Sequence, residues 1–233
     1  GITMQGIFTH FSEADIADKE WAHEQYSRFS AFIDALKGAG VTFNIHHCCN
    51  SAGTLELPDF HREMIRPGII QYGYDASKEV VVTGTKIKPV MSLRCCITHL
   101  KTIYEGDCVG YGRHFTAKGP TKIATLPIGY ADGYNRALSS KIDVIVHGVR
   151  AHQVGNICMD QCMIDVSHIP NVKVGDEVVL FGEQGSECVS ADEIADTCHT
   201  IIHEITCNIN RRVPRIYVQN GKIVQRLEYL TQS

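Results

Sequence analysis

The chain has 233 residues, 44% of them hydrophobic, and a formal net charge of −4 at pH 7. A chain of this length and composition can bury one large core or two smaller ones, so we expect a soluble globular protein. The near balance of charge argues against nucleic-acid binding, and no apolar run approaches the roughly 18 residues that a membrane helix needs.

Ten cysteines would suit the disulfide framework of a short secreted domain. This chain is instead long, shows no signal peptide, and carries its thiols in apolar segments such as SLRCCITHL. We therefore expect reduced, buried thiols and a cytoplasmic protein. The start, GITMQGIFTHF, has no initiating Met and enters a strand-like run almost at once, which predicts that these residues are part of something larger.

Up to residue 85, strand-like runs alternate with a long helix. The runs are MQGIFTH, VTFNIHHCC and MIRPGIIQYG, and Gly38 is placed to cap the helix within residues 21–40. One face of this helix repeats at helical spacing through Ala22, Tyr26, Phe29, Ile33 and Leu36. The alternation predicts an α/β domain over residues 1–85, with parallel strands joined by crossovers.

From residue 86 onward, short strand-like runs are separated by turn signals. They are KIKPVMSLRCCITHLKTI, TKIATLPIGY, KIDVIVHG, DEVVLFGE and RIYVQNGKIVQRL, and they predict a mainly antiparallel β domain over residues 86–233. One helix is expected to interrupt it, in SADEIADTCHTII. Ser190 and Glu193 have the spacing of a capping box, and Ile194, Cys198 and Ile201 share one face.

The stretch VTFNIHHCCNSAG raises the question of a metal site, because it places four candidate ligands in a row: His46, His47, Cys48 and Cys49. Adjacent residues on a strand point to opposite faces, so His46 and Cys48 would share one side and His47 and Cys49 the other. Zinc sites usually draw spaced pairs from two segments, and the other closely spaced cysteines lie in CMDQC. We therefore expect no metal here.

Small residues follow this apolar strand. Asn50 and Ser51 stand where the strand gives way to a loop, and in a strand–helix barrel the strand ends carry the chemistry. A serine hydroxyl with loop amides suits a phosphate. In IRPGIIQYG, Arg66 is expected at a strand end, and Gly68 lets the backbone come close to a ligand. On these residues alone, an ordinary transition from strand to loop, without a ligand, is the better interpretation.

Seven motifs change this interpretation: GIFTHFSEAD, HHCCNSAG, IRPGIIQYG, GYGRHFTA, LPIGYADGYNR, VGNICMDQCMIDV and NRRVPRIY. In order and spacing, through essentially the whole chain, they resemble the pyridoxal-phosphate-dependent alanine racemases. Serine racemases of vancomycin-resistance systems share the pattern. The resemblance implies the C-terminal part of a (β/α)8, TIM-type barrel over residues 1–85, an antiparallel β domain over 86–233, and pyridoxal 5'-phosphate (PLP) at the barrel mouth.

The same resemblance implies that about the first half of the barrel is missing, together with the lysine that bonds to the cofactor. These residues alone are therefore expected to be inactive. The intact protein is expected to convert L-alanine to D-alanine for peptidoglycan. A non-catalytic module for cofactor binding or dimerisation stays open as an alternative, which the mass of the native product and the sequence encoded upstream would decide.

The resemblance also assigns contacts with PLP. Ser51 would donate to the phosphate, joined by backbone N–H groups around Gly68 and Ile69, while Asn50 shapes that loop. Arg66 would face the pyridine nitrogen. Because a guanidinium has a pKa above about 12, it keeps its proton and the ring nitrogen stays unprotonated. The cofactor is then a weak electron sink, which suits racemisation better than transamination.

Racemisation needs an acid–base group on each face of the α-carbon. By resemblance, the missing lysine serves one face and Tyr111 the other. Tyrosine titrates near 10 in water and needs a neighbour that favours the phenolate, and the resemblance places His10 between Tyr111 and Arg66 in that role. Tyr111 would reach the site from the other subunit, as would Met159, whose backbone N–H would bind the substrate carboxylate. A homodimer with shared sites is thus expected.

The resemblance also implies an entrance corridor that contains six side chains: Asp15, His47, Tyr130, Arg136, Asn156 and Asp160. Asp132 and Gly133 predict a tight turn. Two positions depart from the family: His203 stands where a tyrosine commonly forms the inner gate and touches the phosphate, and Asn156 often is an arginine. A smaller polar gate leaves room for a hydroxyl, so serine is an alternative substrate to alanine. His203 would equally serve as a replacement phosphate contact.

Overall fold

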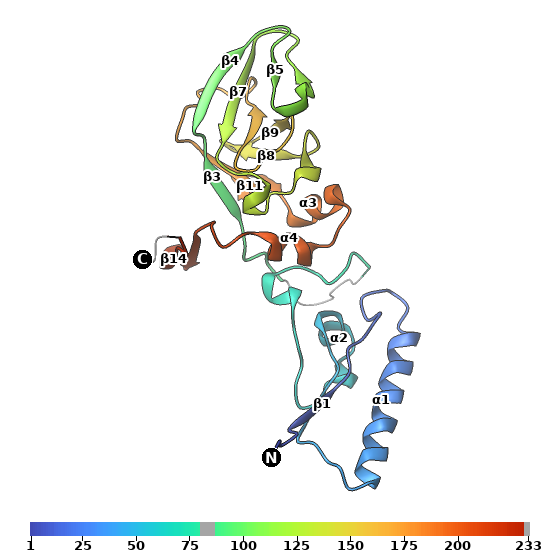
Figure 1. Ribbon diagram of the computed structural model, residues 1–233. Helices are drawn as coiled ribbons and strands as arrows, with labels where there is room; N and C mark the ends of the chain where they lie inside the picture. The colour runs from blue at the N-terminus through green and yellow to red at the C-terminus, as the bar shows by residue number, and fades with distance from the viewer. Residues whose placement is uncertain (80–86, 231–233) are drawn as a thin grey trace. The chain divides into compact units, whose positions relative to one another are not determined.

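The computed structural model describes residues 1–79 and 87–230 and divides into two compact units, Gly1–Val90 and Met91–Ser233 (Figure 1). The domain boundary expected between residues 85 and 86 lies outside the described residues. Within the described parts of the chain, no helix is long and apolar enough to cross a membrane.

The first unit is built around a parallel pair of short strands. Its elements are β1 (Gly6–Phe8), α1 (Glu20–Gly38), β2 (Ile45–His47) and α2 (Ser51–Glu56). The two strands pair with Gly6 opposite Ile45 and Phe8 opposite His47. Parallel neighbours need a long crossover, and α1 is that crossover, the long blue helix of Figure 1. The predicted alternation of strand and helix is confirmed over these elements.

Helix α1 buries the face that its spacing predicts. Ala22 and Phe29 lie in the core of the unit. The predicted cap was wrong by one residue: Gly38 is still helical and Ala39 caps the helix, with its backbone N–H 3.1 Å from the carbonyl oxygens of Ala35 and Leu36. Those bonds close the last turn before Gly40, so a glycine at position 38 is not needed for the ending.

The predicted third strand, in MIRPGIIQYG, is wrong. Residues 64–68 run as a loop into a 3-10 helix, Ile69–Tyr72. The Arg66 N–H donates to the Cys49 carbonyl at 2.9 Å, but Pro67 has no N–H to continue a ladder. Gly68 then leaves the extended region at φ −103° and ψ −96°. Arg66 is therefore held beside the end of β2 by a loop and does not end a strand.

The second unit contains an eight-stranded antiparallel sheet, which confirms the predicted β architecture. The strand order is β12-β11-β8-β9-β10-β7-β4, and β3 also pairs with β11. The bounds are β3 Leu93–Cys96, β4 His99–Ile103, β7 Thr121–Leu126, β8 Asp143–Val146, β9 Val149–Val154, β10 Cys162–Asp165, β11 Glu177–Gln184 and β12 Glu187–Val189. Two separate hairpins add β5 (Cys108–Val109) to β6 (Phe115–Thr116) and β13 (Arg215–Gln219) to β14 (Lys222–Leu227).

Two helices interrupt this sheet, where one was predicted. Helix α3 (Ala191–Cys198) begins as expected, with the Glu193 N–H donating to the Ser190 hydroxyl at 3.0 Å. It ends before Ile201, whose side chain is exposed and precedes a second helix, α4 (Ile202–Asn208). The sequence hides α4 because isoleucine and threonine are weak helix formers, so tertiary packing decides its conformation.

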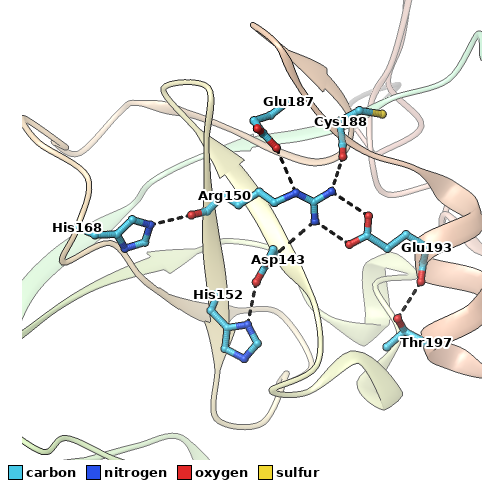
Figure 2. Close-up of polar contacts among 8 residues, drawn as sticks. All are labelled: Asp143, Arg150, His152, His168, Glu187, Cys188, Glu193 and Thr197. Carbon is cyan, nitrogen blue, oxygen red and sulfur yellow. Dashed lines mark hydrogen bonds and ion pairs between the residues drawn. The ribbon is translucent and has the colours of Figure 1, made fainter.

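Arg150 of β9 ties α3 to the sheet (Figure 2). Its guanidinium donates to both carboxylate oxygens of Glu193, at 2.8 and 3.0 Å, and its Nε lies 3.2 Å from Glu187. Asp143 stands 3.8 Å from the same guanidinium, and its other carboxylate oxygen lies 2.8 Å from Nδ1 of His152. Glu193 thus uses its carboxylate on the sheet, while only its backbone N–H serves the helix cap.

Candidate active site

A hydroxyl and a backbone amide converge where β2 leads into α2. The Ser51 side chain is 6% exposed, and the Gly68 N–H donates to its oxygen at 2.9 Å. Asn50 caps α2 by accepting from the Gly53 N–H at 3.0 Å, which fixes the start of the turn that carries Ser51. Because the Ser51 oxygen accepts this bond, its own O–H remains to donate, and a phosphate takes such donors.

Arg66 is held over the ends of both strands. Its Nη2 lies 3.0 Å from the Thr9 carbonyl, 3.3 Å from His10 Nδ1 and 3.4 Å from the Cys48 carbonyl. Its Nη1 contacts Nδ1 of His47. Burial, and then the Arg66 charge, lower the pKa of His47, so a neutral imidazole accepts from the guanidinium. The expected entrance residue His47 therefore also orients Arg66.

The thiols next to these residues do not follow strand geometry. Cys48 and Cys49 are both about 1% exposed and their sulfurs are 3.9 Å apart, so the prediction that they point to opposite sides is wrong. Strand pairing ends at His47, and the backbone turns toward α2. Across residues 1–79 and 87–230, no group of three or more His, Cys, Asp or Glu side chains is placed to hold a metal ion.

In the second unit, Tyr111 stands on a 3-10 turn between β5 and β6, with 79% of its side chain exposed. The Asn156 side-chain amide donates to the Tyr111 carbonyl at 2.7 Å. Asn156, expected at the entrance, thus fixes the backbone of the tyrosine expected to act as a base. The contact consumes one amide donor of Asn156 and gives this departure from the family a local structural role.

The segments around Tyr130 and Met159 are brought together as a docked pair of turns. The Tyr130 N–H donates to the Cys158 carbonyl and the Ala131 N–H to the Met159 carbonyl, both at 3.0 Å. A Cβ on Gly129 would lie 2.1 Å from the Cys158 carbonyl, so the approach requires glycine. Both the Tyr130 and Met159 side chains remain exposed at the surface of this unit.

Sequence reasoning gave no role to Arg212, which fastens these turns. Asp132 is 8% exposed; it accepts from the Gly129 N–H at 2.8 Å and from Arg212 Nε at 2.7 Å. Arg212 Nη2 also pairs with Asp160. The tight turn expected at Asp132 and Gly133 is present, since the Gly133 N–H donates to the Tyr130 carbonyl at 3.2 Å. The basic run NRRVPR was the available signal, but its partner lies far away in sequence.

The remaining candidates lie apart from these contacts within their own units. Asp15 is half-buried and its carbonyl accepts from the Ser77 hydroxyl. Arg136 opens a 3-10 helix, Arg136–Leu138, and His203 is exposed on α4. Two sets of candidate residues result, one in each unit: Ser51, Gly68, Arg66, His10 and His47 in the first, and Tyr111, Asn156, Tyr130, Met159 and Asp160 in the second.

Family models of two domains match the chain. The alanine racemase N-terminal domain matches residues 1–76 and the alanine racemase C-terminal domain matches residues 90–217. Alanine racemase 1 of Clostridium acetobutylicum is 45% identical over 229 residues, which cover 98% of this chain and 59% of that protein. Alanine racemase of Clostridium tetani is 46% identical over 230 residues, with the same coverage of 98% and 59%. The chain thus spans about three fifths of the length of these relatives.

Solved structures agree with the sequence matches. Alanine racemase of Clostridium difficile in complex with cycloserine superposes with a TM-score of 0.92 at 41% identity, covering 98% of this chain and 60% of that one. The Bacillus anthracis enzyme with bound L-Ala-P gives 0.90 at 37% identity, covering 98% and 58%. The fold is accordingly part of a TIM-type barrel followed by a β domain. Two family models, the sequence identities and the structural superpositions agree, and the chain belongs to the alanine racemase family.

Proposed function

We propose that these residues supply the phosphate site, the cofactor-facing arginine and one acid–base group of a PLP-dependent racemase that converts L-alanine to D-alanine for peptidoglycan synthesis. The observation that carries the proposal is the contact of Arg66 with His10, at 3.3 Å, in the same unit as the Ser51–Gly68 pair. A guanidinium backed by an imidazole, together with a buried hydroxyl at a glycine turn, is the arrangement that the family motifs imply.

The donor set in the first unit fits PLP. Ser51 keeps an O–H to donate, and the Gly68–Ile69 turn brings a backbone amide close, since the Gly68 N–H lies 2.9 Å from the Ser51 oxygen. Arg66 would face the pyridine nitrogen with a group that keeps its proton. His203 of the second unit would supply a further phosphate contact, as the family position that it occupies implies. Bound PLP would supply an electron sink that makes the α-hydrogen of the amino acid acidic.

The protein's own side chains would handle the proton. Tyr111 would take it from, or return it to, one face of the α-carbon. Asn156 would hold the Tyr111 backbone in place, as its 2.7 Å bond to the Tyr111 carbonyl supports. The positive field of Arg66, passed on through His10, would favour the phenolate. The Met159 backbone N–H would orient the substrate carboxylate.

The exposed Tyr111 and Met159 side chains support a shared site. They are 79% and 54% exposed within the chain, which fits residues that complete the site of a partner subunit across a two-fold interface. In such a cytoplasmic homodimer, Asp15, His47, Tyr130, Arg136 and Asp160 would line the entrance. Mixing a Tyr111→Phe protein with an Arg66→Ala protein would then restore one intact site per mixed dimer; mixtures that stay as inactive as the two parents would contradict sharing.

The test uses protein expressed from its complete natural reading frame. It should racemise alanine in both directions with PLP bound. Tyr111→Phe should keep PLP but lower turnover by at least ~100-fold, because general acid–base catalysis typically contributes that much. Exchange of the α-hydrogen with solvent should persist for one enantiomer of alanine and nearly vanish for the other. Tyr104→Phe, which removes another exposed hydroxyl of the same unit, is the matched control.

Two outcomes would separate the parts of the proposal. A protein that binds PLP but racemises neither enantiomer of alanine would overturn the activity. Equal exchange of both enantiomers by Tyr111→Phe would leave the activity standing and remove Tyr111 as a one-face base. Serine should be assayed beside alanine, although Asn156 uses its amide on Tyr111 and does not by itself favour a hydroxylated substrate.

A further inference from the structure

Cys48 and Cys49 form a closely spaced pair of thiols that the proposed reaction does not use. Their sulfurs are 3.9 Å apart, and both lie near the Phe60 carbonyl, at 3.3 and 3.5 Å. Both cysteines are free and sit in a small core lined by aromatic rings, among them Phe11. Two thiols that face one acceptor can meet a single thiophilic atom together.

The chain contains a second Cys–Cys pair that shows what is unusual about the first. Cys95 and Cys96 lie within β3, opposite Val178 and Glu177 of β11. Neighbours in a strand point to opposite faces. Accordingly Cys95 is half-buried, with a pKa raised by burial to about 12, whereas Cys96 is exposed. The same dipeptide therefore presents its thiols apart in β3 and together after β2.

The geometry at Cys48 and Cys49 suits chelation better than a disulfide. Neighbouring Cα atoms across a trans peptide are about 3.8 Å apart, below the roughly 4.4–6.8 Å usual for disulfides. When two sulfurs bind one atom, each at about 2.3 Å, the angle between the two bonds lies between a right angle and a tetrahedral angle. The two sulfurs are then roughly 3.3–3.8 Å apart. The observed 3.9 Å needs little adjustment to reach that range.

The two thiols also differ in acidity, which helps the first bond to form. The hydrogen bond from the neighbouring thiol, aided by the Arg62 and Arg66 charges, lowers the pKa of Cys48. The same hydrogen bond and burial raise the pKa of Cys49. The thiolate is the reactive form of cysteine. Cys48 would attack first, and Cys49 would close the ring.

We propose that Cys48 and Cys49 are a binding site for trivalent arsenicals, which take both thiols on one arsenic atom. With a hydrated arylarsine oxide, ArAs(OH)2, each sulfur replaces one hydroxyl: an As–S bond forms, an As–O bond breaks, and the thiol proton leaves with the hydroxyl as water. Arsenic stays trivalent and no oxidant is needed. The inference rests on the thiol geometry and is independent of the racemase proposal.

Burial of both thiols sets how the site is entered. At about 1% exposure, neither sulfur is reached from solvent without local opening of the segment around Phe60. Binding should therefore be slow, and its rate should stop rising at high arsenical concentration, where opening limits it. Once formed, the chelate should resist monothiols and yield to a small dithiol.

Phenylarsine oxide is the probe, with the full reduced chain and intact mass as the readout. One equivalent should bind tightly. Cys48→Ser with Cys49→Ser, or either change alone, should weaken that binding by at least ~100-fold, because the second bond of a chelate is intramolecular. Cys95→Ser with Cys96→Ser is the matched control and should leave the tight equivalent in place. Tight binding that survives in the Cys48, Cys49 variant would overturn the site.

A second measurement needs no variant. The wild-type chain should be loaded with one equivalent of phenylarsine oxide, its open thiols alkylated with iodoacetamide under denaturing conditions, and the peptides mapped. Cys48 and Cys49 should be the protected residues. Protection of Cys158 and Cys162, or of Cys95, in their place would assign the arsenical to another part of the protein and contradict the proposal.

Discussion

Arg212 reaches the buried carboxylate of Asp132 with its Nε 2.7 Å from Oδ1, although 80 residues separate them in sequence. Its other arm pairs with Asp160. One guanidinium thereby fastens the turn that contains Tyr130 to the loop that contains Met159. Both are proposed site residues, so the order of this surface depends on a side chain that would touch no substrate.

Arg212→Met should lower the urea midpoint of the second unit, because it leaves the Asp132 carboxylate in a largely buried place without its cationic partner, although the Gly129 N–H still donates to it. The matched control is Arg94→Met, since the Arg94–Glu177 pair is 44% and 48% exposed and surface pairs contribute about 0–1 kcal/mol. Unfolding should be followed in both variants. Equal shifts would show that Arg212 is an ordinary surface arginine.

Two glycines with similar backbone angles should respond differently to alanine. Gly133 has φ +99° and a Cβ there would lie 2.2 Å from the Asn208 carbonyl, whereas Gly106 has φ +86° and open space around it. Gly106→Ala should cost about 1–2 kcal/mol, the strain of a left-handed conformation. Gly133→Ala should cost roughly 1–3 kcal/mol more, because overpacking adds to the strain. Calorimetry of both variants checks the order, and similar losses would contradict the close approach.

Glu63 should contribute to acid stability of the first unit. The His46 backbone N–H donates to its carboxylate at 2.8 Å, and this bond, together with bonds from the Glu63 backbone N–H and the His46 ring, lowers the pKa of Glu63 from 4.5 to about 2. A carboxylate whose pKa is lower in the folded state stabilises the protein above its unfolded-state pKa. This stabilisation is lost as the pH falls through the folded-state pKa. Wild type should therefore lose stability between about pH 4.5 and 2.

Glu63→Gln should lack that loss. Because half of the Glu63 side chain is exposed, the difference at pH 7 should stay below about 1 kcal/mol, and the two proteins should converge near pH 2. Acid titrations of unfolding free energy measure this. A difference in unfolding free energy that stays constant over the whole pH range would mean that the ionised Glu63 carboxylate does not stabilise the protein.

The Arg150–Glu193 pair should show measurable coupling. Bidentate hydrogen bonds fix both groups (Figure 2), but each side chain is 35% exposed. A double-mutant cycle with Arg150→Met and Glu193→Gln should therefore give a coupling free energy of only about 0.5–1 kcal/mol. The coupling should fall in 1 M salt, which screens exposed charges. The single-bond pair Arg28–Glu24 of α1 should give about 0.3–0.5 kcal/mol. A larger value for that pair would refute the role of bidentate geometry.

Local pattern accounts for the elements that sequence reasoning predicted. The predicted short runs between turn residues contain β3, β4, β7, β8, β11, β13 and β14, and α1 has a periodic apolar face, whereas β5, β6, β9, β10 and β12 were not predicted. What it missed depends on single backbone groups or on distant partners. Pro67 stops a third strand by lacking one N–H, the turn after His47 brings Cys48 and Cys49 together, and Arg212 finds Asp132 across 80 residues. None of these leaves a periodic signal.

In the candidate site, resemblance to the family predicted one of the observed contacts, between Arg66 and His10, and missed others. The motifs singled out Arg66, His10 and Ser51, and the structure places the first two 3.3 Å apart. That His47 also contacts Arg66, and that Asn156 holds Tyr111, follows from side-chain directions in loops, which spacing in sequence does not encode. Tyr111 and Arg66 belong to different units, and their joint action stays a proposal.

The last prediction concerns the proposed phosphate site at Ser51 and Gly68, and it separates loss of a phosphate contact from a general loss of structure. In protein from the complete reading frame, Ser51→Ala removes a donor from a nearly buried place and should weaken PLP binding by roughly 10- to 100-fold, since a hydrogen bond to a charged group is worth about 1.5–3 kcal/mol. Pyridoxal, which lacks the phosphate, should bind the variant and the wild type equally. Ser30→Ala, at a serine that accepts from Arg62 in the same unit, should change neither affinity. Equilibrium dialysis measures all six values. If Ser51→Ala weakened pyridoxal as much as PLP, the hydroxyl would be holding the Gly68 turn in shape and not the phosphate.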